Sequence, residues 1–198
     1  FPLKKEGPDL KPSTLNATGY RLSMKRAAWL LGLGVFLFAL IAVIWMHLPR
    51  EVDVRLEGVK YRLGRENASL VEPAAIHIEG TVRRTLKGHR LFRGTVELEG
   101  ESMPVPKKQM KNHTFIARKG DGFWLAYHWF EHGTIGKGFP LGTLYANRDF
   151  SQITLTLFEQ GEDGNGYSWN GGDGLMLTAP AKNRTEALRL ANKLMEHS

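Results

Sequence analysis

The chain has 198 residues, 42% of them hydrophobic, and a net charge of +7. This length suits one domain with an extra segment but not two ordinary domains. The chain contains no cysteine, which excludes disulfide bonds, thiolate metal sites and a cysteine nucleophile. The charge is uneven, because residues 1–26 carry +4 and residues 47–198 only +3. Since a nucleic-acid-binding domain concentrates cations on itself, we expect no nucleic-acid partner.

The first part of the chain divides into a polar tail and an apolar segment. Residues 1–23 are polar without a steady period and predict a disordered tail, which is not native if the natural start is Met24. The run from Ala27 to Met46 holds 20 residues without a charge, with Trp29 and Trp45 near its ends. At about 1.5 Å per residue it covers a hydrocarbon core of roughly 30 Å. We therefore predict a transmembrane anchor over residues 24–48.

The charges beside this segment predict its direction. Cations precede the run, whereas carboxylates accompany the first cation after it: Arg21, Lys25 and Arg26 before, and Arg50 with Glu51 and Asp53 after. The positive-inside rule then places the N-terminus in the cytoplasm and the C-terminal domain outside. A cleaved signal peptide is the alternative. The run is long for a signal peptide and no small-residue cleavage site follows it, so we favour an uncleaved anchor.

Residues 49–198 show the short period-two patterns of an extracytoplasmic β-rich domain. Apolar and polar residues alternate over 52–58, 75–84, 90–100 and 152–159, with glycine-containing turn signals between them. In 152–159, isoleucine and leucine alternate with threonine, which predicts a half-buried strand. The glycine-rich segment 162–174 predicts a hairpin loop before a strand at 174–178. These patterns predict an antiparallel β-sandwich or a strongly curved sheet or barrel.

The C-terminus predicts an amphipathic helix over residues 184–197. Asn183 can cap the helix, and Glu186 follows three residues later in a capping-box arrangement. Apolar residues then recur at helical spacing, which favours a helix packed on the sheet. The predicted fold class is therefore mainly β, of α+β type.

The segment YHWFEHG, residues 127–133, contains His128, Glu131 and His132 in the H-x-x-E-H order of an inverted zinc-peptidase motif. Such a site needs both histidines on one helix face and a third ligand. Here glycines at 122 and 133 flank alternating aromatic residues, which favour a strand. We predict a strand buried on both sides or facing a ligand groove, with His128 and His132 on one face. We expect no catalytic residue, cofactor or metal, and keep a zinc-dependent hydrolase as the alternative.

Two further groups of residues are candidate ligand or partner sites. Lys107, Lys108 and Lys111 form a basic run that can meet an anionic cell-wall polymer or lipid, as can a group of arginines at 83, 84, 90 and 93. The other group is aromatic: Trp124, Trp129 and Trp169 can stack on a sugar or contact a partner. A solvated loop and a packed core, respectively, are the simpler interpretations.

Three segments carry a resemblance to a known group of proteins. They are IEGTVRRTLKGHRLFRGTVELEG, GTLYANRDFSQITLTLFE and APAKNRTEALRLANKLM, behind a short N-terminal anchor. From Met24 onward the chain resembles membrane-anchored proteins of Gram-positive, Bacillus- and Paenibacillus-like bacteria that have no assigned activity. The shared motifs are structural, such as hairpin glycines at Gly80 and Gly94, so the resemblance implies no catalytic residue.

Taken together, these patterns predict a single-pass protein of the bacterial cell membrane with an extracytoplasmic domain. We expect a non-enzymatic interaction or sensing module of the cell envelope, with the membrane as one partner and an envelope protein or anionic wall polymer as another.

Overall fold

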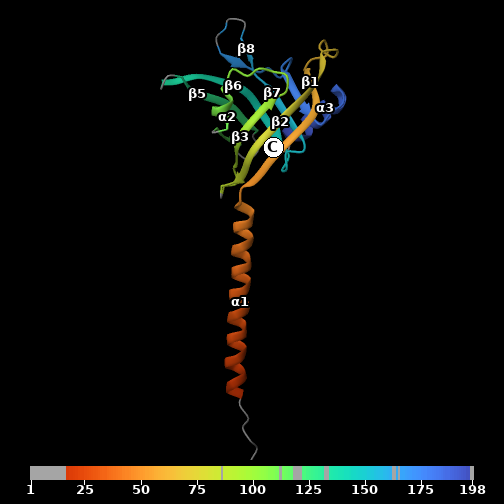
Figure 1. Cartoon of the computed structure of the whole chain (residues 1–198). Coiled ribbons are helices and arrows are strands. Elements are labelled where there is room, and N and C mark those ends of the chain that lie inside the picture. The colour runs from red at the N-terminus through yellow and green to blue at the C-terminus, as the bar shows by residue number, and fades with distance from the viewer. Residues whose placement is uncertain are drawn as a thin grey trace, which may run out of the picture. The chain divides into compact units, whose positions relative to one another are not determined.

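The computed structural model describes residues 17–85, 87–111, 113–117, 122–131, 134–161, 164 and 166–196. The chain divides into two compact units, Phe1–Met46 and His47–Ser198 (Figure 1). Most of the predicted disordered tail lies outside the described residues. Helix α1 (Ala17–His47) begins before the predicted anchor start at Met24, because an established helix propagates cheaply into neighbouring residues.

Helix α1 carries the predicted apolar span. Its stretch Arg26–Trp45 is long and apolar enough to cross a membrane, and none of it is buried within the structure. Trp29 is 82% exposed and Trp45 is 74% exposed. Leaving this much apolar surface in water is unfavourable by about 25 cal/mol per Å². The helix is therefore compatible with a single-pass anchor, although length and composition alone would also fit a signal sequence.

The second unit is built from antiparallel strands with two helices. Its described elements are β1 (Arg50–Arg62), β2 (Val71–Arg84), β3 (Arg90–Leu98), α2 (Lys107–Met110), β4 (Thr114–Ala117), β5 (Phe123–Glu131), β6 (Thr134–Ala146), β7 (Ile153–Leu157), β8 (Glu159–Gln160), β9 (Tyr167–Ser168), β10 (Leu175–Ala179) and α3 (Arg184–Glu196). The sequence did not predict β6, because its glycines and Pro140 resemble turn signals.

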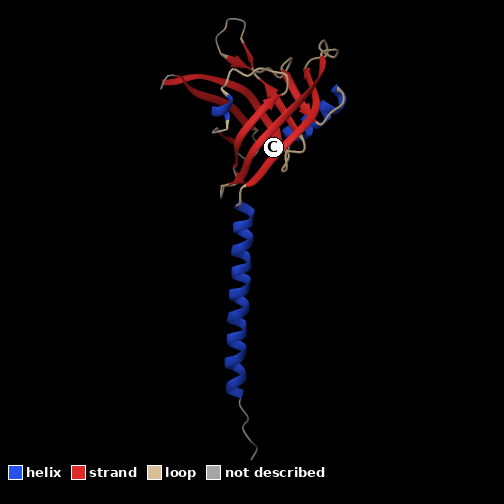
Figure 2. Cartoon of the chain, in the orientation of Figure 1, coloured by secondary structure: helices blue, strands red, loops and turns tan. Residues whose placement is uncertain are grey.

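One eight-stranded sheet makes up most of the unit, in the order β4-β3-β2-β1-β10-β7-β6-β5. All its pairings are antiparallel, and β8 and β9 form a separate two-stranded hairpin. The sheet curves until its edge strands β4 and β5 approach each other without forming a ladder. Figure 2 shows the strands curving around a common interior. The fold is mainly β with a nearly closed curved sheet, so the curved-sheet alternative is confirmed and the sandwich is not.

The concave face of the sheet encloses an aromatic core. Phe92 is fully buried, and its ring lies 6.0 Å from Phe115, 6.0 Å from Phe123 and 5.7 Å from Phe150 between centroids. These rings come from β3, β4, β5 and the β6–β7 turn. One residue therefore joins strands that are distant in sequence, and offset or edge-on geometry adds to the gain from burial.

Arg90 joins strands across one end of the interior. Its guanidinium donates to the carbonyl oxygens of Ala146 at 2.8 Å and Asn147 at 3.0 Å, and lies 5.0 Å from the centre of the Phe123 ring. Burial, and then the nearby charge of Arg84, lower the pKa of Arg90. This arginine is thus packed against the core. Of the four arginines considered for polymer binding, Arg90 is the one whose side chain serves the fold instead.

Helix α3 covers the convex face of the sheet over β1, β10 and β7, which explains why all five residues of β7 are buried. The threonines of β7 were predicted to face solvent, and this was wrong. Thr154 instead bonds Thr178 of β10 at 3.0 Å, and Thr178 bonds Tyr61 of β1 at 3.2 Å. A chain of hydroxyls satisfies these buried polar groups beneath the helix.

The predicted cap of α3 is confirmed. The Glu186 amide donates to Asn183 Oδ1 at 2.9 Å, and Ala187 and Ala191 face the sheet. The return bond differs from a standard capping box, because the Glu186 carboxylate accepts from the Lys182 amide at 3.0 Å.

Candidate interaction surfaces

Strand β5 presents one buried and one exposed face. Tyr127 and Trp129 point into the core, whereas Trp124 is 58% exposed and Phe130 is 66% exposed. The prediction of burial on both sides was therefore wrong, because no described element covers the outer face. Exposed Ile116 of the neighbouring strand β4 adds to this apolar surface. Of the three candidate tryptophans, Trp124 offers the most accessible ring.

The zinc-peptidase order falls on this strand and not on a helix. His128 and Glu131 belong to β5, and His128 is exposed. His132 lies outside the described residues, so its predicted shared face with His128 cannot be placed. Within the described parts of the chain, no group of three or more histidine or acidic side chains could hold a metal ion. Residues four apart on a strand share a face but lie about 13 Å apart, compared with about 6 Å along a helix, so a strand does not bring two such ligands to one metal ion.

Side chains of the α2 segment bind the free backbone edge of β5. Gln109 accepts from the Phe130 amide at 2.9 Å and donates to the Phe130 carbonyl at 3.3 Å. His113 Nε2 lies 2.8 Å from the His128 amide nitrogen and 2.7 Å from its carbonyl oxygen. The primary amide of Gln109 thus replaces a strand residue at an edge that would otherwise be unpaired.

His113 has hydrogen-bond partners at both ring nitrogens. Its Nδ1 lies 3.1 Å from the Gln109 carbonyl oxygen and 3.3 Å from that of Met110, and both can only accept. A hydrogen on Nδ1 finds these two carbonyls and leaves Nε2 to accept from the His128 amide, whereas a hydrogen on Nε2 finds the His128 carbonyl. Both ring nitrogens thus take part in joining α2 to β5.

Replacing Gln109 by alanine removes both bonds to Phe130 and should lower the free energy of unfolding by about 1–2 kcal/mol. Exchange of the Phe130 amide hydrogen should speed up by about fivefold, because a lost bond of this kind is worth roughly 1 kcal/mol. Hydrogen exchange with fragment mass spectrometry measures this, with exposed Lys108→Ala as the neighbouring control. Equal exchange at Phe130 in both variants would contradict the assigned role.

Tyr127 of β5 contacts the backbone of β3 from the inner face of the sheet. Its hydroxyl accepts from the Val96 amide of β3 at 3.1 Å. Burial raises the pKa of Tyr127 to about 12, so the hydroxyl stays protonated at neutral pH. Beyond Arg93, β3 has no ladder with β4, and this hydroxyl satisfies a backbone group exposed by the gap.

The basic run lies beside carboxylates. Lys111 is 3.0 Å from Glu79 of β2, and Lys107 is 3.6 Å from Glu97 of β3. Lys108 is exposed, whereas Met110, which lies between Lys108 and Lys111 in the sequence, is buried. Because two of the lysines have an acidic neighbour, the local positive field available to an anionic polymer is reduced.

Trp169 folds back on its own domain. Its indole nitrogen donates to the Leu175 carbonyl at 3.0 Å, and the ring packs against the cluster beneath α3. The predicted loop 162–174 contains β9, whereas its partner strand β8 precedes the loop, and residues 162, 163 and 165 lie outside the described residues. Trp129 is buried in the core. Neither ring is placed as a stacking platform.

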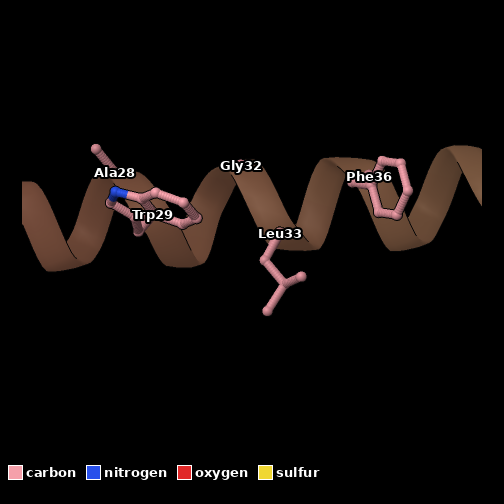
Figure 3. Close-up of a pocket in the computed structure, with 5 residues that line it drawn as sticks. All are labelled: Ala28, Trp29, Gly32, Leu33 and Phe36. Carbon is pink, nitrogen blue, oxygen red and sulfur yellow. The ribbon is translucent and has the colours of Figure 1, made fainter.

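The apolar helix has a surface hollow of its own. Ala28, Trp29, Gly32, Leu33 and Phe36 line it. Figure 3 shows that Gly32 leaves the ribbon bare between the rings of Trp29 and Phe36. An added side chain at Gly32 would meet no described atom within 4 Å, so the hollow is open surface.

The sequence did not indicate the edge-binding roles of Gln109 and His113. They lie in a segment interpreted as a basic loop, and their partners follow some 15 to 21 residues later. The signal available was the apolar pair Val105 and Met110, which the structure buries in the main core.

Comparison of the chain with protein-family models, with curated proteins and with solved structures finds no match.

Proposed function

We propose that the chain is a single-pass membrane protein whose β-rich domain lies outside the cytoplasm and serves as an interaction or sensing module of the bacterial cell envelope. The observation that carries this proposal is the uncharged apolar stretch of α1, whose side chains are not covered by any described residue. A lipid bilayer supplies the missing cover. The cations before the stretch and the carboxylates after it favour a cytoplasmic N-terminus.

The surface of the domain supports an interaction role. Trp124 and Phe130 of β5 and Ile116 of β4 leave large apolar side chains in solvent, and exposed aromatic side chains are enriched at partner sites. The zinc-hydrolase alternative is less favoured, because His128 and Glu131 lie on a strand. Polymer binding through the basic run is less favoured, because Lys107 and Lys111 lie beside glutamates.

The lack of cysteine makes the orientation directly measurable, because each introduced thiol is unique. We expect Ala68→Cys, on an exposed turn of the domain, to react with a membrane-impermeant maleimide in intact Gram-positive cells. Ser23→Cys, before the apolar stretch, should react only after lysis. The cysteine-free parent is the control.

Labelling of Ser23→Cys but not Ala68→Cys in intact cells would reverse the proposed orientation. A mature chain that lacks α1 by intact mass would show a cleaved signal sequence and overturn the anchor. Recovery in the soluble fraction with α1 still attached would overturn the membrane location.

A further inference from the structure

Strand β1 has a partner along both edges for only part of its length. From Arg50 to Glu57 each residue pairs with β2, opposite Val82 to Ala75. The ladder with β10 begins only at Val59. No hydrogen bond from a described residue reaches the backbone of Arg50–Glu57 on the β10 side. This segment, called the β1 free edge below, therefore presents unpaired N–H and C=O groups on alternate residues.

An open groove of about 980 Å³ includes part of this edge. It is lined by residues 55–59 of β1, residues 73–75 of the paired strand β2, Glu99 and Gly100 after β3, and residues 180–182 after β10. Strands β1 and β10 approach each other closely at Gly58, where an added Cβ would overlap the Thr178 carbonyl oxygen. Strand β10 ends at Ala179, so the space beyond it stays open.

The side chains along the β1 free edge alternate in chemistry. Val52, Val54 and Leu56 face the apolar core, with the last two only half-buried. On the other face Glu51, Asp53 and Glu57 are exposed. The cation of that face, Arg55, is bound to Glu99 at 2.6 Å, and Asp53 lies 2.9 Å from His77 Nε2 of β2, whereas no ion pair is found for Glu51 or Glu57 among the described residues. The outer face is thus acidic and the inner face apolar.

We propose that the β1 free edge docks an extended polypeptide strand of a partner protein in which basic and apolar residues alternate. A row of backbone donors and acceptors is matched by another extended chain, whose own groups repeat at about 3.3 Å per residue. Basic side chains of that strand lie opposite the carboxylates, and apolar ones extend the core over Val54 and Leu56. The inference deepens the proposed function, on which it rests, by naming the partner's chemistry.

Charge also favours a basic strand over a second copy of the chain as the partner. In the two antiparallel registers with the largest overlap of two such edges, carboxylates face each other. One register places Glu51 opposite Glu57 and Asp53 opposite Arg55, and the other places Asp53 opposite Asp53 and Glu51 opposite Arg55 of the second copy. Each register thus keeps at least one carboxylate pair, and like charges directly opposite are destabilising. A basic strand meets the three carboxylates without such a pair, so it fits better than self-pairing.

The test uses the full chain in a neutral detergent and a fluorescent peptide of alternating lysine and valine, measured by anisotropy. We expect binding that weakens at least about tenfold when backbone nitrogens on one edge of the peptide are methylated, because the hydrogen bonds are lost and the charge is kept. Amide hydrogens of Glu51–Glu57 should gain protection from exchange when the unmethylated peptide binds.

Two double variants distinguish binding at the β1 free edge from a general effect of net charge. Glu51→Lys with Glu57→Lys should weaken binding at least about tenfold, since like charges then face the peptide. Glu66→Lys with Glu196→Lys makes the same change in net charge at exposed positions elsewhere and should change binding by less than about twofold. Circular dichroism shows whether each variant is folded, and the methylated peptide tests the idea on the unchanged protein.

Several outcomes would overturn the proposal: equal binding of the methylated peptide, no added protection in β1, or equal loss in both double variants. Light scattering that shows dimers whose interface protects β1 would assign the edge to a second copy. These results do not depend on the side of the membrane on which the domain lies. Failure here, with correct thiol labelling, would therefore reject the docking site and leave the envelope location standing.

Discussion

Replacing Phe92 by alanine is expected to lower the free energy of unfolding by about 3–5 kcal/mol. Phe92 is fully buried, and its ring contacts Phe115, Phe123 and Phe150 from three other segments of the unit. The substitution removes the ring and leaves a cavity that these neighbours, held on different strands, can fill only in part. Chemical denaturation of the full chain in detergent, followed by near-ultraviolet circular dichroism, measures the loss.

Phe130→Ala is the matched control, because it removes the same atoms from a side chain that is 66% exposed. We expect a change within about 0.5 kcal/mol, as is usual for surface positions. Equal destabilisation by the two substitutions would show that Phe92 is not the centre of the core.

Gly142→Ala is expected to destabilise the domain by about 3 kcal/mol or more. Gly142 lies in β6 at a β-bulge, where Leu125 pairs with Gly142 but the next residue, Ala126, pairs with Pro140. Its φ is 151°, and an added Cβ would overlap the Thr156 carbonyl oxygen of β7. A backbone oxygen held in a ladder cannot move aside without breaking the β6–β7 pairing.

Gly138→Ala, on the same strand, supplies the control. Its Cβ would meet the His128 ring at 3.2 Å, and that ring belongs to an exposed side chain that can rotate. We expect a change within about 1 kcal/mol. Thermal unfolding of both variants gives the comparison, and a Gly142→Ala protein as stable as Gly138→Ala would refute the bulge argument.

The role of glycine in this sheet was only partly predictable. Gly80 and Gly94 fall within the predicted strands 75–84 and 90–100, and in the β2–β3 hairpin they pair directly with each other, which the sequence did not indicate. An added Cβ on either would overlap backbone atoms of the facing strand. A pattern of glycines between apolar runs marks places where the chain needs space, but it does not say whether a turn or a close strand contact requires it.

The candidate interaction surfaces show the same limit. Alternation in β5 predicted two distinct faces, and the structure confirms the strand. Which face is covered depends on elements elsewhere in the chain, so the exposure of Trp124 and the burial of Trp129 could not be separated by periodicity alone. Likewise, the bond between His113 and His128 depends on the curvature that brings α2 to the edge of β5.

The sequence by itself determined the properties that depend on neighbours along the chain. These are the uncharged span of α1, the period-two strands and the capped helix α3, because hydropathy, strand period and capping are local. Tertiary structure decided which faces meet. Helix α3 buries the threonines of β7, and β10 ends before it can cover Arg50–Glu57 of β1. These outcomes depend on the register between distant strands, and a local pattern reports that a face is apolar without identifying what covers it.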